Sequence, residues 1–226
     1  MKRTILTLSV VLAASLASGE KTWESKPSTE WTTTETAALL ENSPWSQQQT
    51  FHVRGVHPGS SGQPAGGWAV SRSPKVYTIS FLSARPVRMA RGRWAALVGG
   101  EGAEGWEQAF GRDGSNPFRR YVVVSVRASS GPEQAALNGQ TTENLRKQTY
   151  LLLANSKRRI PLVKYVSPAV SGGKDALFFF PRQEGGADIF TPGAGGVRFR
   201  CRLNDWTLLD RKFSLQRMSF RGEFEI

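Results

Sequence analysis

Between residues 197 and 203, apolar and basic side chains alternate without a break. Four apolar residues occupy the odd positions and three arginines the even ones: Val197, Phe199, Cys201 and Leu203 against Arg198, Arg200 and Arg202. Successive side chains of a strand point to opposite faces of its sheet, so this period of two predicts a strand with one buried and one wet side. The chain is therefore expected to contain an antiparallel sheet that exposes a row of guanidinium groups.

Further strands are expected where β-branched and aromatic residues cluster between turn residues. They cover residues 50–56, 76–82, 121–128, 160–166 and 176–180. Residues 142–154 fit either a helix or a strand. Near the C-terminus the apolar positions change from odd, at Phe213 and Leu215, to even, from Met218 onward, which predicts a bulge or a bend near residues 216–217.

The first helix has clear boundary signals. Thr32 and Glu35 have the spacing of a capping box, in which each side chain accepts a hydrogen bond from the other residue's backbone amide. An Asn-Ser-Pro sequence then follows, and the residue before a proline disfavours helix, so a short helix is expected over about 33–41. Trp31 and Trp45 bracket it, and both rings are expected to hold it against the main body.

Two more helices are expected between the strands. Apolar residues at helical spacing, from Val87 to Val98, predict an amphipathic helix that begins near Ser83 and ends at Gly99. Its outer face carries four basic residues: Arg85, Arg88, Arg91 and Arg93. A shorter helix is expected over 104–110.

These patterns predict an α+β fold, mainly antiparallel, with about seven strands and about three short helices, because strands and helices do not alternate as in a parallel α/β protein. Hydrophobic residues make up 39% of the chain, including seven Trp and twelve Phe, which is enough to bury a core. The single cysteine excludes a disulfide scaffold within the chain. No internal repeat or linker is evident, so residues 20–226 are expected to form one domain.

The first 19 residues have the pattern of a secretory signal peptide. Two basic residues, Lys2 and Arg3, precede a short apolar stretch and then small residues, with cleavage expected after Ala17 or Gly19. The apolar stretch is shorter than the roughly 20 residues that span a bilayer, and no later segment is long and apolar enough to do so. The product is therefore expected to be exported, to the periplasm or the medium.

Positive charge is the strongest functional signal in the chain. Its formal net charge is +12, and loss of Lys2 and Arg3 with the leader would leave +10. Arginine forks suit phosphate and carboxylate groups. We expect an anionic-ligand surface among the arginines of the helix and the strand: Arg85, Arg88, Arg91, Arg93, Arg198, Arg200 and Arg202. Export favours envelope polymers or a partner protein over nucleic acid, and a plain solvated face remains the alternative.

No catalytic, metal or cofactor site can be assigned from the sequence. His52 and His57, the only histidines, have no further ligands at a recognised spacing. Cys201 lies on the apolar side of its strand, where a thiol is expected to be buried and inert. Glutamates at three-residue spacing, Glu101, Glu104 and Glu107, keep open a hydrolase that acts on cell-wall or polysaccharide substrates.

Several segments resemble a group of exported bacterial proteins of unknown function. The similar stretches are Lys26-Pro27-Ser28-Thr29-Glu30-Trp31, Asn42-Ser43-Pro44-Trp45, Phe179-Phe180-Pro181-Arg182 and residues 213–224. This patchy match reaches both ends of the mature chain and implies export and a single unit, but no activity, cofactor or site residue.

The expected function is therefore a non-enzymatic binding or assembly domain of the cell envelope with a basic surface. Two alternatives remain: the hydrolase with unassigned carboxylates, and a structural subunit of an envelope complex. The second is suggested by a strand that ends at Ile226 and would leave an edge available for pairing. The oligomeric state is not predicted.

Overall fold

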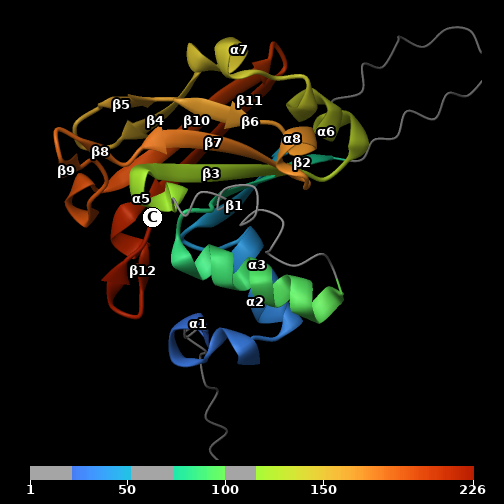
Figure 1. Ribbon diagram of the computed structural model, residues 1–226, viewed down its shortest axis with the longest axis vertical. Helices are drawn as coiled ribbons and strands as arrows, with labels where there is room; N and C mark the ends of the chain where they lie inside the picture. The colour runs from blue at the N-terminus through green and yellow to red at the C-terminus, as the bar shows by residue number, and fades with distance from the viewer. Residues whose placement is uncertain (1–21, 52–73, 100–115) are drawn as a thin grey trace, which may run out of the picture.

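The computed structural model describes residues 22–51, 74–99 and 116–226 (Figure 1). These residues form an α+β fold in which every strand pair is antiparallel, as the sequence predicts. The described ranges contain more strands than the seven expected: nine lie in two main sheets and four in two short hairpins. The expected leader, the helix over 104–110 and both histidines lie outside these ranges.

The larger sheet, sheet A, has the strand order β1-β2-β3-β7-β6. Its strands are β1 (Ser46–Phe51), β2 (Lys75–Phe81), β3 (Tyr121–Ala128), β7 (Asp175–Pro181) and β6 (Lys164–Val166). Sheet B has the order β11-β10-β4-β5. Its strands are β11 (Thr207–Ser214), β10 (Gly196–Asn204), β4 (Thr149–Leu153) and β5 (Arg159–Pro161). Strands β8 (Gln183–Glu184) and β9 (Ala187–Asp188), and strands β12 (Ser219–Phe220) and β13 (Glu223–Phe224), form the two hairpins.

The two sheets pack face to face through aromatic side chains. Phe178 of β7 meets Phe199 of β10 edge-on, with ring centroids 5.3 Å apart. Phe81 of β2 meets Phe213 of β11 in the same way at 4.9 Å. All four rings are buried within one continuous hydrophobic cluster. The inner face of β10 is therefore the apolar side that the alternation predicts.

Each pair of sheet edges is joined. On one side the chain itself passes from β5 in sheet B to β6 in sheet A across residues 162–163. On the other side, glutamine side chains of β1 bind the free backbone edge of β11. Gln49 Nε2 donates to Leu208 O at 2.9 Å, and Gln49 Oε1 accepts from the Asp210 amide at 2.8 Å. Gln47 Nε2 donates to Lys212 O at 2.9 Å, so side-chain amides replace a strand pairing here.

Helices α2 (Thr33–Glu41) and α3 (Arg85–Val98) pack against each other beside sheet A, on its outer face (Figure 1). The capping box of α2 is formed, with Thr32 and Glu35 bonded in both directions. Trp31 and Trp45 are buried in the same hydrophobic cluster as Leu39 of α2, as expected for rings that hold this helix against the body. Gly99 ends α3 with a φ of 66°, a left-handed conformation that favours glycine.

The remaining helices are short. They are α1 (Thr22–Ser25), α5 (Pro117–Arg120), α6 (Gly131–Asn138), α7 (Thr142–Arg146) and α8 (Pro168–Ser171). Helix α6 was not expected, although Pro132 at its start is a typical helix-opening signal. Residues 142–154, which fit either structure, contain both: α7 is followed directly by β4. Among the described residues, no helix is long and apolar enough to cross a membrane.

The C-terminal segment folds back onto the body. A 3-10 turn, η3 (Leu215–Arg217), separates the odd and even apolar positions, so a bend rather than a bulge changes the face. Ile226 is buried, and its carbonyl oxygen accepts from the Arg182 guanidinium at 2.5 Å. Trp45 Nε1 donates to Glu225 O at 2.7 Å. The prediction of a free strand edge at Ile226 is therefore wrong, because the C-terminal residues pack against the core.

Candidate functional site

The arginines expected on the outer face of α3 are largely engaged within the molecule. Arg85 forms ion pairs with Glu223, at 2.8 Å, and with Glu225, at 3.1 Å. Arg88 donates to the Ser83 carbonyl, and its guanidinium lies 4.8 Å from the centre of the Phe118 ring. These contacts tie the start of α3 to the C-terminal segment and to α5.

The other two arginines of α3 point toward buried partners. Arg93 Nε donates to the Trp31 carbonyl oxygen at 2.8 Å. Arg91 forms an ion pair with Asp175 of β7, and its side chain is only 15% exposed. Arg91 thus turns to sheet A rather than to solvent, since a long side chain on the flank of a helix can reach a buried carboxylate.

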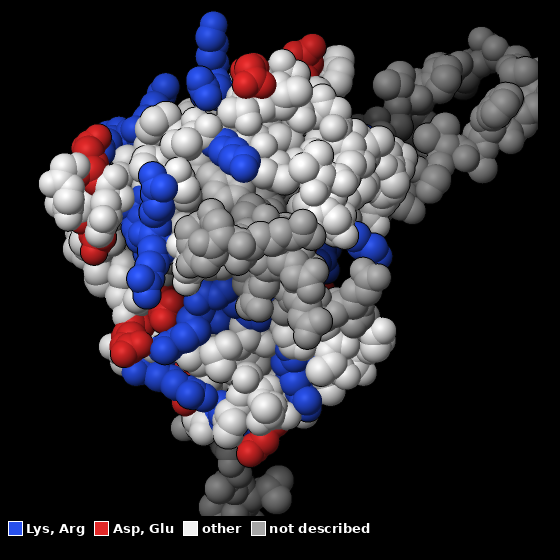
Figure 2. All heavy atoms as spheres, in the orientation of Figure 1, with Lys and Arg blue, Asp and Glu red and all other residues white. Residues whose placement is uncertain are grey.

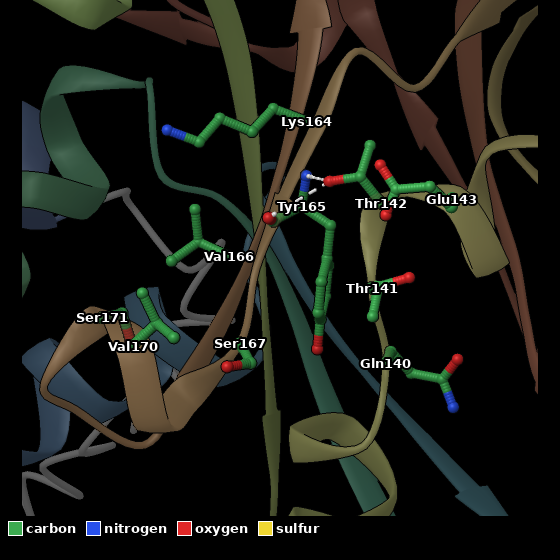
Figure 3. A pocket seen from close by; sticks show the side chains of 10 residues that line it. All are labelled: Gln140, Thr141, Thr142, Glu143, Lys164, Tyr165, Val166, Ser167, Val170 and Ser171. Carbon is green, nitrogen blue, oxygen red and sulfur yellow. Dashed lines mark hydrogen bonds between the residues drawn. The ribbon is translucent and has the colours of Figure 1, made fainter.

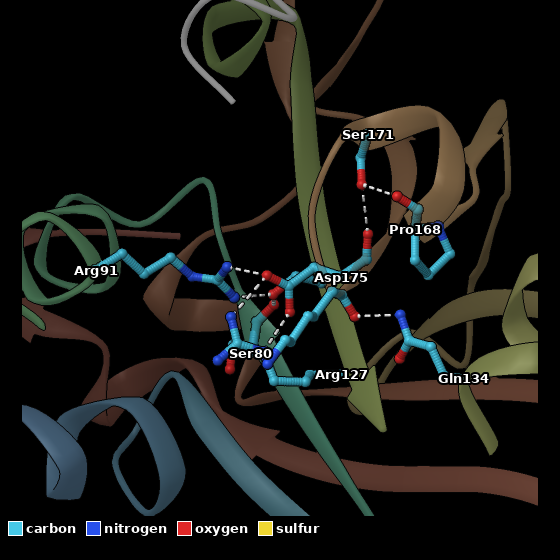
Figure 4. A network of polar contacts seen from close by, with 9 residues as sticks. Ser80, Arg91, Arg127, Gln134, Pro168, Ser171 and Asp175 are labelled. Carbon is cyan, nitrogen blue, oxygen red and sulfur yellow. Dashed lines mark hydrogen bonds and ion pairs between the residues drawn. The ribbon is translucent and has the colours of Figure 1, made fainter. Parts of the chain in front are cut away.

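Asp175 is the centre of a buried polar network (Figure 4). Arg91 and Arg127 both bind its carboxylate, with Arg127 making two bonds of 3.0 Å, and Arg91 also donates to Ser125 Oγ at 2.8 Å. Burial alone would raise the pKa of Asp175, but the two guanidinium groups outweigh it and hold this pKa well below its usual range. A carboxylate that stays ionised and accepts from two arginines has no proton to donate, so this network is suited to structure rather than to acid catalysis.

The outer face of sheet B gathers basic side chains from three strands. Strand β10 contributes Arg198, Arg200 and Arg202, as the alternation predicts. The register brings two more cations beside them: Lys212 of β11 pairs with Arg198, and Arg159 of β5 pairs with Leu152 of β4, which itself pairs with Arg198. We call this set the basic face: Arg159, Arg198, Arg200, Arg202 and Lys212. With Asp210, the carboxylate among them, its formal charge is +4.

The side chains of the basic face differ in how strongly they are held. Arg198 binds Asp210 through both nitrogens of its fork, and this hydrogen bonding raises the pKa of the Arg198 guanidinium. Arg159 lies over the Tyr150 ring, 4.6 Å from its centre. Within the described part of the chain, Arg200 and Arg202 have no ion pair, so their charges are available to a ligand.

The geometry of the basic face suits a ligand with repeated anionic groups. Alternate residues of a strand lie about 7 Å apart, and neighbouring strands about 4.8 Å apart. The cations are therefore spread over a sheet face rather than gathered in a pocket. Because each guanidinium offers a fork of donors, such an array can bind several phosphate or carboxylate groups at once.

Elsewhere, basic and acidic side chains are mixed. Figure 2 shows the face of Figure 1, where Lys and Arg side chains lie in a band that continues below the sheets with acidic side chains among them. The ion pair of Arg158 with Glu184, whose side chains are 39% and 71% exposed, is of this kind. Such pairs leave less unbalanced charge for a ligand than the basic face does.

A shallow pocket lies between α7, β6 and α8 (Figure 3). Its volume is about 390 Å³, and Thr142 closes one side by accepting from the Tyr165 amide at 3.0 Å. Glu143 and Lys164 are the only charged residues among those that line it. A glycoside hydrolase of the usual kind needs two facing carboxylates, and this pocket offers one.

Cys201 is not a reactive thiol. It lies on the inner face of β10 and is fully buried, and burial raises its pKa to about 12. Among the described residues, no cluster of three or more His, Cys, Asp or Glu side chains is placed to hold a metal ion. His52, His57, Glu101, Glu104 and Glu107 lie outside those residues.

Sequence reasoning missed the cross-strand members of the basic face. Arg159 and Lys212 carry no local pattern that links them to Arg198, because the register between strands set their position. The two arginine groups that the sequence places together lie on separate elements: Figure 1 shows α3 well apart from β10. The arginines of α3 and those of β10 therefore do not form one array, because those of α3 are engaged in contacts within the molecule.

No protein-family model, curated protein or solved structure matches the chain. The resemblance to exported proteins of unknown function therefore stays a prediction.

Proposed function

We propose that this protein is an exported, non-enzymatic binding or assembly domain that holds an anionic component of the cell envelope on its basic face. The observation that supports this proposal is the concentration of five cations around one carboxylate on the solvent side of sheet B. Charges spread over a sheet face suit a surface or a polymer better than a small molecule.

The proposal also accounts for how the other arginines are used. Those of α3 contact carboxylates, backbone carbonyls or a ring, and so contribute to the fold. Arg200 and Arg202 make no such contacts among the described residues. Charge of one sign on one face attracts an anionic partner over roughly a Debye length, about 10 Å at 0.1 M salt.

Retention on immobilised heparin or polyphosphate tests the proposal. The wild-type protein is expected to bind at low ionic strength and to elute as salt rises. The double variant R200Q/R202Q is expected to bind more weakly, with the slope of log affinity against log salt falling by about one for each arginine removed, because fewer counterions are released.

The matched control is R119Q/R217Q, which removes the same charge from two exposed arginines outside the basic face. It is expected to elute close to the wild type. Equal losses in both double variants would show that net charge alone governs retention. Elution of the wild type without retention at low salt would contradict the proposal.

A further inference from the structure

The turn between β10 and β11 presents a tryptophan to solvent. Trp206 is 91% exposed, and it is the only aromatic side chain among the described residues that lies so open. The turn does not depend on the ring, because the Trp206 backbone amide donates to Asn204 Oδ1 at 3.0 Å. Among the described residues no side chain covers this ring, so a large apolar surface is available for a partner to bury.

Basic side chains also lie at the same end of the sheet. The amide of Arg202, near the end of β10, donates to Gln148 O at 3.4 Å, which places the C-terminal end of α7 beside the hairpin. Arg146, Lys147 and Arg202 are all exposed there. Two acidic side chains, Asp205 and Glu143, lie in the same turn and helix, so these five residues together carry a formal charge of +1.

We infer that the anionic component held by the basic face is a phospholipid surface, and that Trp206 inserts into its headgroup region. This inference rests on the proposed function and names its ligand. Tryptophan prefers the boundary between water and lipid because it combines an apolar ring with an N–H donor. Arg202 and the end of α7 contact headgroup phosphates while the ring is inserted.

Charge and insertion have to act together in this arrangement. Each Lys or Arg near an anionic membrane adds a modest attraction, and a single apolar anchor gives only weak, reversible attachment. A few basic residues with one inserted ring therefore predict peripheral binding that salt reverses. A soluble polyanion could satisfy the arginines but would leave the ring in water, and this difference separates a lipid surface from a polymer.

The test measures binding to vesicles of phosphatidylglycerol and phosphatidylcholine in equal parts, with vesicles of phosphatidylcholine alone for comparison. All variants are prepared with the same N-terminus, read by mass spectrometry, so that any remaining leader contributes equally. The wild type is expected to bind the anionic vesicles only. W206A is expected to bind them about tenfold more weakly, the effect of losing roughly half the burial of an aromatic side chain.

Two further variants and a fluorescence measurement test whether the Trp206 ring itself is responsible for binding. W206F is expected to keep most of the binding, whereas V98A, which trims an exposed side chain on α3, is expected to change nothing. Brominated lipid is expected to quench the tryptophan fluorescence of the wild type, and to quench that of W206A much less. Circular dichroism should show that each variant is folded, as the exposure of Trp206 leads us to expect.

The possible failures are distinguishable. If W206A binds anionic vesicles as the wild type does, the lipid inference is overturned, while retention on heparin leaves the proposed function standing. If W206A loses heparin retention as strongly as vesicle binding, the ring stacks on a polymer and the inference is again overturned. If the wild type binds neither vesicles nor heparin, both proposals fail.

Discussion

Glu35 shows how one side chain can define the start of a helix. Its carboxylate accepts from Lys26 Nζ, from the Thr32 amide and from the Thr32 hydroxyl, at 2.8, 2.8 and 3.0 Å. The hydrogen bond from Lys26, followed by that from the Thr32 amide, lowers the pKa of Glu35 to about 2. Thr32, Glu35 and the spacing between them were sufficient to predict where the helix begins, because a capping box is a local interaction.

The lowered pKa makes stability depend on pH in a known direction. Because the folded-state pKa lies below the ordinary value of 4.5, the unfolded chain binds the proton more readily between them. The contribution of Glu35 to the free energy of unfolding is therefore complete above about pH 4.5 and is lost as the pH falls toward 2. Urea unfolding at several pH values is expected to show a smaller loss for E35Q than for the wild type over this window.

The exposed Glu30 supplies the control for this measurement. E30Q is expected to follow the wild-type pH profile, since among the described residues Glu30 has no ion pair. Profiles of E35Q and the wild type that run parallel from pH 4.5 to 2 would show that the capping box does not contribute to acid stability.

At the scale of elements, the contact between β1 and β11 joins two sheets without a strand pairing. Three consecutive glutamines run along β1, and the alternation of a strand directs Gln47 and Gln49 toward β11 and Gln48 away from it. A primary amide has the same donor and acceptor as a peptide group, so Gln49 can pair with the edge of β11 as another strand would. An edge that is bonded in this way is less open to pairing with another chain.

Replacement of Gln49 by alanine is expected to weaken this join. The amide of Asp210 would lose its acceptor, and we expect the free energy of unfolding to fall by about 1–3 kcal/mol. Hydrogen exchange at the Asp210 amide should become faster than in the wild type. Q48A removes a neighbouring glutamine of the opposite face and should change neither quantity, so similar effects in the two variants would argue against a specific role of Gln49.

At the scale of the molecule, Asp175 connects the helical layer to sheet A. It receives Arg91 from α3 and Arg127 from the neighbouring strand β3. The side chains of Asp175 and Arg91 are 12% and 15% exposed, whereas that of Arg127 is 46% exposed. The pair with Arg91 is therefore the part that solvent screens least, and it crosses between layers.

Removal of this carboxylate is expected to destabilise the whole fold. D175A leaves the guanidinium of Arg91 buried without its counter-charge, and we expect a loss of about 3–5 kcal/mol in the free energy of unfolding. Chemical denaturation followed by circular dichroism measures it. D205A, which removes an exposed aspartate, should stay within about 0.5 kcal/mol of the wild type. A similarly small effect of D175A would contradict the role assigned to the network.

The sequence predicted the elements better than their partners. The boundaries of α2 and β3, and the two faces of β10, agree with the structure because they depend on caps and on the alternation of neighbouring residues. Helix α6 was missed although its start carries a proline. The turn at residues 215–217 was predicted only as a change of face, since a bulge and a bend have the same effect on the alternation.

By itself the sequence determined the class of the fold and the row of arginines on β10, because both follow from periodicities within a single segment. Only the tertiary structure decided which charges act together. Strand register brought Arg159 and Lys212 beside that row, while packing against sheet A and the C-terminal segment engaged the arginines of α3. The reason is physical: a side chain's face is set by its own backbone, but its neighbours are set by contacts between segments far apart in the chain.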